Sequence, residues 1–471
     1  MIRMRVYLTI DFGSTYTKLT AIDLGTEEIL ATAKAITTIE DDIMIGFNNA
    51  FVALEEQISS KTDLDKVEFV RKVACSSAAG GLKMVAIGLI PDLTADAAKK
   101  AALGAGARVI ETFSFELNNR EMRKIKELPL DIILLAGGTD GGNKQCIIHN
   151  AKLIAKHQID VPVIVAGNKV AEDEIEEIFE EAGIDYYIAD NVMPKLNKLN
   201  VEPAREAIRK VFMNKIVEAK GLGNAEEFVS GILMPTPAAV LKAAEVLADG
   251  SDEEKGLGDL IIVDIGGATT DIHSIGKGIP TQAGVIPKGL EDPYSKRTVE
   301  GDLGMRYSAL ALLEASGTKK IREYLGDADK KVDVKDHCNY RHDNIKMVPG
   351  SKDEIKFDEA MAMAATEIAM ARHCGVLESV YTPMGAMYYQ LGKDLINTPY
   401  VIGTGGVIVH SENPHRILAS GNFNEEEPIH LKPRDPKFLV DRTYILSSMG
   451  LLAQELPDVA VRIMKKYLIE E

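Results

Sequence analysis

The chain has 471 residues, 46% of them apolar, and a formal net charge of -17. This length is typical of about three domain-sized units with ample material for packed cores. The acidic excess argues against clamping of nucleic-acid phosphates and against a basic membrane-binding surface.

Two further features bear on location. No run of about 20 apolar residues is present, so we expect no membrane span. The short apolar run near the N-terminus is broken by Asp11, which is untypical of a signal peptide. We therefore expect a cytoplasmic protein without nucleic-acid or membrane partners. Its scattered cysteines are expected to be reduced thiols.

In chain order, the first elements predicted are short strands and helices. Three apolar or alternating segments with glycine-containing turns predict a β-meander over the first forty residues. Residues 41–60 predict an amphipathic helix. Residues 91–106 predict a second helix, with Thr94 as its cap and Gly104 near its C-terminus. From residue 132 to about 190, strand and helix patterns alternate, which is the βαβ signature of a parallel sheet.

The second half of the chain contains further predicted helices. Residues 235–250 predict a helix that ends at Gly250, and residues 358–374 predict a helix rich in Met and Ala. The stretch KDHCNYRHD, at 335–343, is expected to be a surface loop. The tail predicts two helices broken near Pro457. The order of elements favours an α/β fold.

The first candidate site is the turn in LTIDFGSTYTKLTAID. A buried strand ends near Asp11, and Gly13, Ser14 and Thr15 form a tight turn before a second strand that carries Lys18. Backbone N–H groups in such a turn form a concavity that suits phosphates. Asp11 suits a hydrated Mg²⁺, which keeps much of its water shell. The alternative for this stretch alone is an ordinary hairpin with a buried polar end.

The second candidate site, VDIGGATTDI, repeats this pattern about 250 residues later. Its strand ends near Asp264, Gly266 and Gly267 turn the backbone, and Asp271 opens the next strand. Thr269 and Thr270 add hydroxyl groups, as Ser14 and Thr15 do in the first turn. Two such hairpins could hold one nucleotide from opposite sides, with Asp11 and Asp264 sharing one Mg²⁺.

A third glycine turn lies in VIGTGGVIVH. Gly403, Gly405 and Gly406 follow an apolar strand and would let a flat adenosine lie against the backbone. A lone glycine turn is weak evidence. Three turns in the order phosphate, phosphate, adenosine are much stronger evidence for a nucleotide site.

This order of motifs resembles the actin, sugar kinase and heat-shock ATPase superfamily. The helix predicted by PTPAAVLKAAEVL and the stretch VEGDLG are similar to segments that flank the second phosphate loop there. The resemblance implies two actin-like (ribonuclease H-like) lobes around a nucleotide cleft, with inserted α/β subdomains. It implies ATP and Mg²⁺ as cofactors, water-orienting roles for Asp11, Asp264 and Asp271, and phosphate contacts from Thr15, Lys18 and Thr269.

The resemblance narrows through ACSSAAGGLKMVAIGLIPDLTADAAKKAALGAGARV, KRTVEGDLGMR and YILSSMGLLA. These stretches look like the MutL (GlmL) family, an accessory protein of methylaspartate (glutamate) mutase. The resemblance implies a Mg²⁺-dependent ATPase that releases damaged cobalamin from an adenosylcobalamin-dependent mutase, and it implies mutase subunits as partners. The oligomeric state is left open.

On this basis we predict five segments. Residues 1–140 form the first ATPase lobe and 141–225 an inserted α/β segment. Residues 226–290 form the second lobe with the second phosphate loop, 291–395 an inserted helical subdomain, and 396–471 the end of the second lobe with the adenosine-type turn.

Three other functions are compatible with the same motifs. A small-molecule kinase of the superfamily would need a catalytic base beyond the γ-phosphate, and no such residue stands out. A nucleotide-gated scaffold or filament protein would turn over ATP slowly or not at all. A hydantoinase-type subunit is the third, because IVDIGGATTDI is similar to that branch too.

Overall fold

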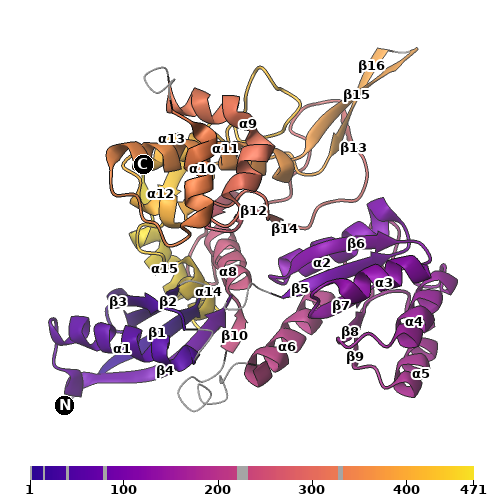
Figure 1. Ribbon diagram of the computed structural model, residues 1–471, viewed down its shortest axis with the longest axis horizontal. Helices are drawn as coiled ribbons and strands as arrows, with labels where there is room; N and C mark the ends of the chain where they lie inside the picture. The colour runs from indigo at the N-terminus through magenta and orange to yellow at the C-terminus, as the bar shows by residue number, and fades with distance from the viewer. Residues whose placement is uncertain are drawn as a thin grey trace. The chain divides into compact units, whose positions relative to one another are not determined.

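The computed structural model describes residues 3–13, 16–38, 42–77, 82–219, 232–326, 332–383 and 385–471. These residues form two compact units, each built from three segments of the chain (Figure 1). Unit 1 comprises Met1–Ala243, Gly289–Pro293 and Leu446–Ile463. Unit 2 comprises Ala244–Lys288, Tyr294–Ile445 and Met464–Glu471.

The first sheet of unit 1 has the strand order β10-β4-β1-β2-β3. Its strands are β1 (Met4–Phe12), β2 (Tyr16–Asp23), β3 (Glu28–Ile36), β4 (Val67–Ser76) and β10 (Ile232–Pro235). β1, β2 and β3 are antiparallel, which confirms the predicted meander, and β4 and β10 are parallel to β1 and to each other. Helix α1 (Ile43–Ser59), capped by Asp42, packs Phe47 and Leu54 into the core of this sheet.

Unit 2 repeats this plan with the order β14-β12-β11-β17-β18-β19. Its strands are β11 (Leu260–Ile265), β12 (Thr270–Ile275), β14 (Ser295–Glu300), β17 (Tyr400–Thr404), β18 (Lys437–Val440) and β19 (Ile469–Glu470). The first three are antiparallel and the next two are parallel to β11, with β19 added at the edge. The shared topology confirms an α/β protein with two similar lobes.

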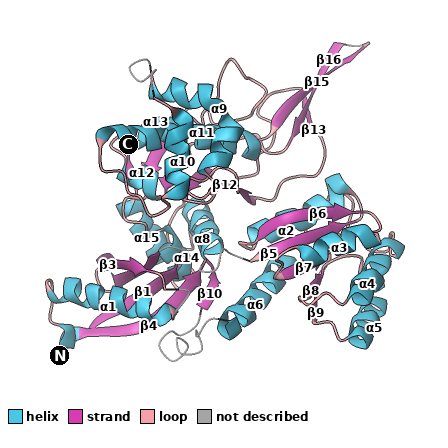
Figure 2. Ribbon diagram, viewed as in Figure 1, coloured by secondary structure: helices cyan, strands magenta, loops and turns pink. Residues whose placement is uncertain are grey.

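A second sheet in unit 1 is fully parallel, with the order β6-β5-β7-β8-β9. Its strands are β5 (Lys83–Gly88), β6 (Arg108–Ser114), β7 (Ile132–Leu135), β8 (Val163–Val165) and β9 (Tyr186–Ile188). Helices α2 (Asp96–Gly104) and α6 (Glu202–Ala219) cover one face, and α3 (Asn119–Glu127), α4 (Gln145–His157) and α5 (Glu172–Ala182) cover the other. Figure 2 shows these strands between their helices. The predicted βαβ pattern is confirmed.

Two details differ from the sequence expectations. The parallel sheet includes β5 and β6, which precede residue 141, because the small, Ala-rich residues of this region pack as a buried layer. Thr94 does not cap α2. It lies in a π-helical turn, η2 (Pro91–Ala95), and its hydroxyl accepts from the backbone N–H groups of Leu89 and Ile90.

Helices of unit 2 cover one face of its main sheet. They are α9 (Ala309–Leu325), α10 (Val334–Asp343), α11 (Lys352–His373), α12 (Gly406–His410) and α13 (Pro414–Ala419). A small sheet adds β13 (Val285–Pro287), β15 (Val376–Thr382) and β16 (Gly385–Leu391). The expectation of a surface loop at 335–343 is wrong. This stretch belongs to α10, because Cys338 and Arg341 are buried against α11.

The remaining described elements are helical. They are η1 (Leu64–Lys66), η3 (Lys169–Ala171), α8 (Thr236–Asp249), α14 (Leu446–Leu452) and α15 (Pro457–Tyr467). α14 and α15 confirm the tail helices separated near Pro457. α14 belongs to unit 1, whereas residues 396–471 were expected to end the second lobe. Within the described residues, no helix has the length and apolar content that crossing a bilayer requires.

Candidate functional site

The first turn joins β1 to β2 as a tight hairpin. The Gly13 N–H donates to the carbonyl oxygen of Tyr16 at 3.1 Å. A Cβ atom at Gly13 would lie 2.6 Å from that oxygen, so only glycine fits here. The predicted residues Ser14 and Thr15 lie outside the described residues.

Asp11 is held in place by two hydroxyl groups from distant parts of unit 1. Its carboxylate accepts from the hydroxyl of Thr236, at the start of α8, at 2.6 Å, and from that of Ser447, in α14, at 3.1 Å. Asp11 is only 6% exposed. A buried carboxylate that two hydroxyl groups hold at a hairpin fits a role near a bound metal ion.

Two residues flank Asp11 on the neighbouring strands. Lys18 is its cross-strand partner on β2 and therefore lies on the same face of the sheet. Cys75 is its partner on β4. Burial, followed by the charge of Asp11, raises the pKa of the Cys75 thiol well above its ordinary value, while Lys18 has a small opposite effect. Cys75 is therefore an inert thiol in this position.

The second turn joins β11 to β12 with the same geometry as the first. The Gly266 N–H donates to the Thr269 carbonyl oxygen at 2.9 Å. Asp264, two residues before Gly266, is the cross-strand partner of Asp271. The two carboxylates therefore lie on one face of the sheet of unit 2.

Asp271 is paired with a buried arginine. Arg297, on β14, contacts the Asp271 carboxylate at 3.2 Å, and the two side chains are 4% and 13% exposed. Burial raises the pKa of Asp271, and the Arg297 charge opposes this rise. Burial likewise keeps the pKa of the neighbouring His273 far below its usual value, so the imidazole is neutral. Arg297 thus favours the ionised form of a carboxylate in a poorly solvated place.

The segment after β14 is hydrogen-bonded to the carbonyl oxygens of the second turn. The backbone N–H groups of Met305 and Arg306 donate to the carbonyl oxygens of Gly266 and Gly267. The Ser308 hydroxyl donates to the Ala268 carbonyl oxygen at 2.7 Å. These bonds fix the carbonyl side of the turn, so its N–H groups keep a defined direction.

Thr270 takes part in this fastening rather than facing outward. It is fully buried, and its hydroxyl donates to the Leu303 carbonyl oxygen at 2.6 Å. This bond ties the start of β12 to the segment behind the turn. Thr269 is half-buried at the turn itself, and Gly267 is exposed.

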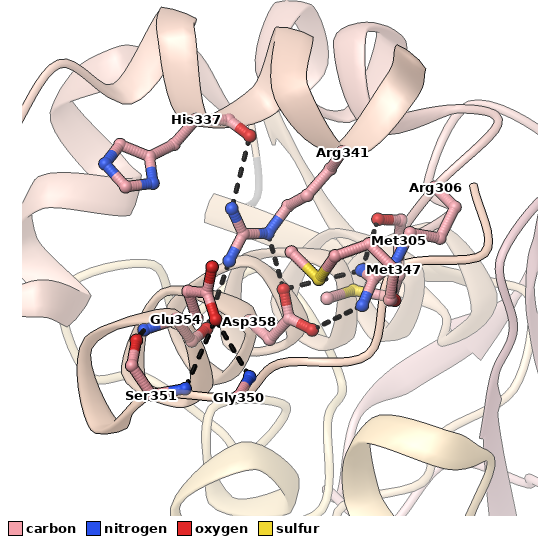
Figure 3. Close-up of polar contacts among 9 residues, drawn as sticks. All are labelled: Met305, Arg306, His337, Arg341, Met347, Gly350, Ser351, Glu354 and Asp358. Atoms are coloured by element: carbon pink, nitrogen blue, oxygen red, sulfur yellow. Dashed lines mark hydrogen bonds and ion pairs between the residues drawn. The ribbon is translucent and has the colours of Figure 1, made fainter. Parts of the chain in front are cut away.

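Arg306 connects this segment to the helices of unit 2, as Figure 3 shows. Its guanidinium donates to the Asp358 carboxylate at 2.7 Å and to the Met347 carbonyl oxygen at 3.2 Å. Asp358, on α11, also accepts from Arg341, which is completely buried and lies on α10. One buried carboxylate therefore binds two arginines and joins the second turn to α10 and α11.

The third turn follows β17. Gly405 has φ of 93°, and a Cβ atom there would lie 2.3 Å from the carbonyl oxygen of Ile265. Only glycine allows this approach to the end of β11. Gly403 lies in β17, and Gly406 begins α12 near the hydroxyl of Tyr444. Burial, followed by the charges of Asp264 and Asp441, raises the pKa of Tyr444.

The predicted residues thus fall into two groups. Asp11, Gly13 and Lys18 belong to unit 1, and the described others to unit 2. Within the described residues, no group of three or more His, Cys, Asp or Glu side chains forms a ready metal cage. Single carboxylates at hairpins suit an ion held mainly by water and phosphate oxygens, as Mg²⁺ usually is.

Sequence reasoning missed four supporting residues, which are Thr236, Arg297, Arg306 and Ser447. Each is far from its partner along the chain. The resemblance did draw attention to their segments, since KRTVEGDLGMR contains Arg297 and Arg306, and YILSSMGLLA contains Ser447.

The repeated sheet, with a carboxylate hairpin in each lobe, defines a protein of the actin, sugar kinase and heat-shock ATPase class of fold. The family described as MutL protein matches residues 7–468. Protein MutL of Clostridium tetanomorphum is 65% identical over 467 residues, covering 99% of this chain and 100% of that protein. The chain therefore belongs to the MutL protein family.

Solved structures with similarity to this chain include two kinases. Gluconate kinase from Lactobacillus acidophilus is 11% identical, covers 99% of this chain and 93% of its own, and has a TM-score of 0.34. Plasmodium falciparum glycerol kinase with ADP is also 11% identical, covers 98% and 90%, and has a TM-score of 0.34.

Proposed function

We propose that this protein is an ATP-dependent reactivating factor for an adenosylcobalamin-dependent mutase of the glutamate mutase type. The observation that carries the ATPase part is the duplicated hairpin, with Asp11 in one lobe and Asp264 in the other, each two residues before a glycine that closes the turn. Membership of the MutL family supports the choice of client.

The hairpins would act by positioning and by neutralising charge, as phosphoryl-transfer sites do. We propose that the backbone N–H groups of both turns, with Thr15, Thr269 and Lys18, bind the β- and γ-phosphates. Asp11 and Asp264 would hold Mg²⁺ through water, and Mg²⁺ would neutralise phosphate charge. Asp271 would orient the attacking water. Gly403, Gly405 and Gly406 would lie against the adenosine.

The supporting residues fit these roles. The Thr236 and Ser447 hydroxyls fix the Asp11 carboxylate, and Arg297 favours the ionised form of Asp271. The hydrogen bonds of Met305, Arg306 and Ser308 fix the second turn. Such preorganisation accounts for a large part of catalysis at sites that stabilise developing charge.

ATP binding and hydrolysis would drive the release of damaged cobalamin from the mutase. Adenosylcobalamin enzymes use radical chemistry, and a lost radical leaves an inactive cofactor bound. A nucleotide-dependent change in the reactivating factor would weaken the grip of the mutase on that cofactor, and fresh adenosylcobalamin would then enter.

The inserted parallel sheet offers a surface for the mutase subunits. Among side chains described between residues 82 and 214, the exposed large apolar ones are Ile90, Phe115, Val170 and Leu196. They follow β5, β6, β8 and β9 along the chain, and so come after the carboxyl ends of these strands, Val170 in η3 and the other three in loops. Apolar side chains gathered on one edge are typical of a protein-binding surface. We propose that the mutase docks there.

A reactivation assay tests the proposal. Glutamate mutase is inactivated with hydroxocobalamin, then mixed with this protein, ATP, Mg²⁺ and adenosylcobalamin. We expect recovery of activity that requires ATP. ATP hydrolysis without recovery would rule out this client and leave the nucleotide site standing. Phosphorylation of a small molecule would favour a kinase instead.

The docking surface is tested in the same assay. We expect Phe115→Ser with Leu196→Ser to abolish binding to the mutase and reactivation while ATP hydrolysis in the absence of the mutase continues. Val52→Ser, at an exposed position on α1, is the matched control. Equal binding by both variants would place the mutase on another surface.

A further inference from the structure

A tyrosine with a strained backbone lies beside the third turn. Tyr444 follows β18 and belongs to unit 2, as do the second and third turns. Its φ is 55°, in the left-handed region that a bulky residue rarely adopts. Such strain persists only where the surrounding structure fixes it, and it is common at functional sites.

Asp441 fixes the position of Tyr444 from three residues before it. The Asp441 N–H donates to the Gly403 carbonyl oxygen at 3.0 Å, and the Asp441 carboxylate accepts from the Ile445 N–H at 2.9 Å. The Tyr444 N–H donates to the Asp441 carbonyl oxygen at 3.3 Å. Asp441 is completely buried. The end of β17, which leads into the third turn, therefore sets the place of Tyr444.

The phenol of Tyr444 lies at the third turn itself. The Tyr444 hydroxyl oxygen would lie 3.6 Å from a Cβ atom at Gly406. The ring centroid of Tyr444 lies 6.1 Å from that of His410, on α12. The Tyr444 side chain is partly exposed, so a ligand bound at this turn can contact it.

The same phenol is influenced by the carboxylate of the second turn. Asp264 is the register partner of Thr404 on β17, directly before the third turn. Burial, followed by the charges of Asp264 and Asp441, raises the pKa of Tyr444, so the hydroxyl stays protonated and can donate a hydrogen bond. In the proposed site, Tyr444 is thus near both a glycine assigned to adenosine and a carboxylate assigned to Mg²⁺.

The ribose is the part of ATP that suits this place. It joins the adenine to the phosphates, so it should lie between the groups that hold the adenine and the groups that hold the metal. A phosphate oxygen at the phenol would face the charge of Asp441, which would repel it. A ribose hydroxyl is neutral and can accept a hydrogen bond from a phenol.

We infer that the Tyr444 hydroxyl donates a hydrogen bond to the ribose of the bound nucleotide and makes the site prefer ribonucleotides to deoxynucleotides. The inference rests on the proposed function, because it requires ATP to bind at the glycine turns. It adds to that function the residue that recognises the sugar.

Calorimetric binding of nucleotides tests the inference. Dissociation constants of ADP, 2′-deoxy-ADP and 3′-deoxy-ADP, each with Mg²⁺, are measured for the natural full chain and for Tyr444→Phe, which keeps the ring and removes only the hydroxyl. Tyr324→Phe is the matched control, because the Tyr324 hydroxyl on α9 also contacts a carboxylate, that of Glu367, at 2.7 Å. We expect the natural protein and Tyr324→Phe to bind ADP about threefold to tenfold more tightly than one deoxy analogue. In Tyr444→Phe this preference should disappear.

The results separate this inference from the proposed function. A preference lost against the 2′-deoxy or the 3′-deoxy analogue supports the inference and identifies the ribose oxygen. A preference that persists in Tyr444→Phe overturns the inference alone, as does an equal loss of affinity for all three nucleotides or the absence of any preference in the natural protein. If the natural protein binds none of the nucleotides, the proposed nucleotide site is wrong and the inference is wrong with it.

Discussion

The two hairpins have one backbone design and different charges. In both, a carboxylate lies two residues before a glycine whose N–H closes the turn. The cross-strand partner of Asp11 is Lys18, whereas that of Asp264 is Asp271. The first hairpin therefore pairs an acid with a base, and the second pairs two acids. In the proposed site, Lys18 would therefore add a phosphate contact to the first hairpin, and Asp271 would add a water-orienting carboxylate to the second.

Asp11 and Asp271 also differ in the groups that hold their carboxylates. Asp11 is held by neutral hydroxyl groups of Thr236 and Ser447, which come from α8 and α14. Asp271 is held by the charged Arg297 on the adjacent strand. A charged partner affects protonation, whereas a hydroxyl group mainly affects orientation.

The largest effect is expected from Asp264→Ala. Removing this carboxylate should lower Mg²⁺-dependent ATP hydrolysis by about 10²–10³-fold, because a charge-stabilising group is lost from the site. Turnover is measured by phosphate release, and an unchanged melting curve shows that the fold is retained. Turnover equal to that of the natural protein would remove the second hairpin from the site.

The charge difference between the hairpins predicts that substitutions in one change KM and substitutions in the other change kcat. Lys18→Met should raise KM for ATP about tenfold with little change in kcat, because it removes a phosphate contact made before and during the reaction. Asp271→Asn should instead lower kcat about a hundredfold with little change in KM, since it removes water orientation. Steady-state measurements of KM and kcat for both variants test these separate roles. The same kinetic effect in both would contradict separate roles.

Arg306→Lys should have a smaller effect, because Arg306 positions the turn without touching ATP. Lysine cannot reproduce the planar fork that contacts Asp358 and the Met347 carbonyl oxygen. We expect kcat to fall about fivefold to tenfold and amide exchange to quicken at Gly266 and Met305, whose N–H groups are bonded at this turn. A merely structural role would lower the melting temperature without altering exchange at the turn in the folded protein.

The smallest expected effect is a shift in the pH dependence of kcat/KM. Burial raises the pKa of Asp271 and Arg297 opposes the rise, so Arg297→Gln should raise that pKa further. The acid limb of the rate profile should then move to higher pH, with loss of activity beginning nearer neutrality. The profile of kcat/KM against pH measures this shift. A limb that stays in place would show that Asp271 does not control it.

The sequence was informative where a signal is local. Hydrophobic patterns with glycines identified the meander, both hairpins and the βαβ segment, since a strand that ends in a glycine turn needs only neighbouring residues. The sequence could not place Ser447 against Asp11 or Arg297 against Asp271, because side-chain partners far along the chain leave no spacing rule. It assigned residues 335–343 to a surface loop, because the burial of Arg341 depends on its bond to Asp358, which lies far along the chain.

Unit 1 is built from three separate segments of the chain, and this affects when its site can form during synthesis. Asp11 is made among the first residues, yet the Ser447 hydroxyl that fixes it follows 436 residues later. The third segment of unit 1, Leu446–Ile463, is also made near the C-terminal end of the chain. The support of the first hairpin can therefore be completed only after Ser447, 436 residues downstream of Asp11, has been made. Contacts so distant along the chain form late and slowly. Until then, the nascent protein would hold an unfinished site.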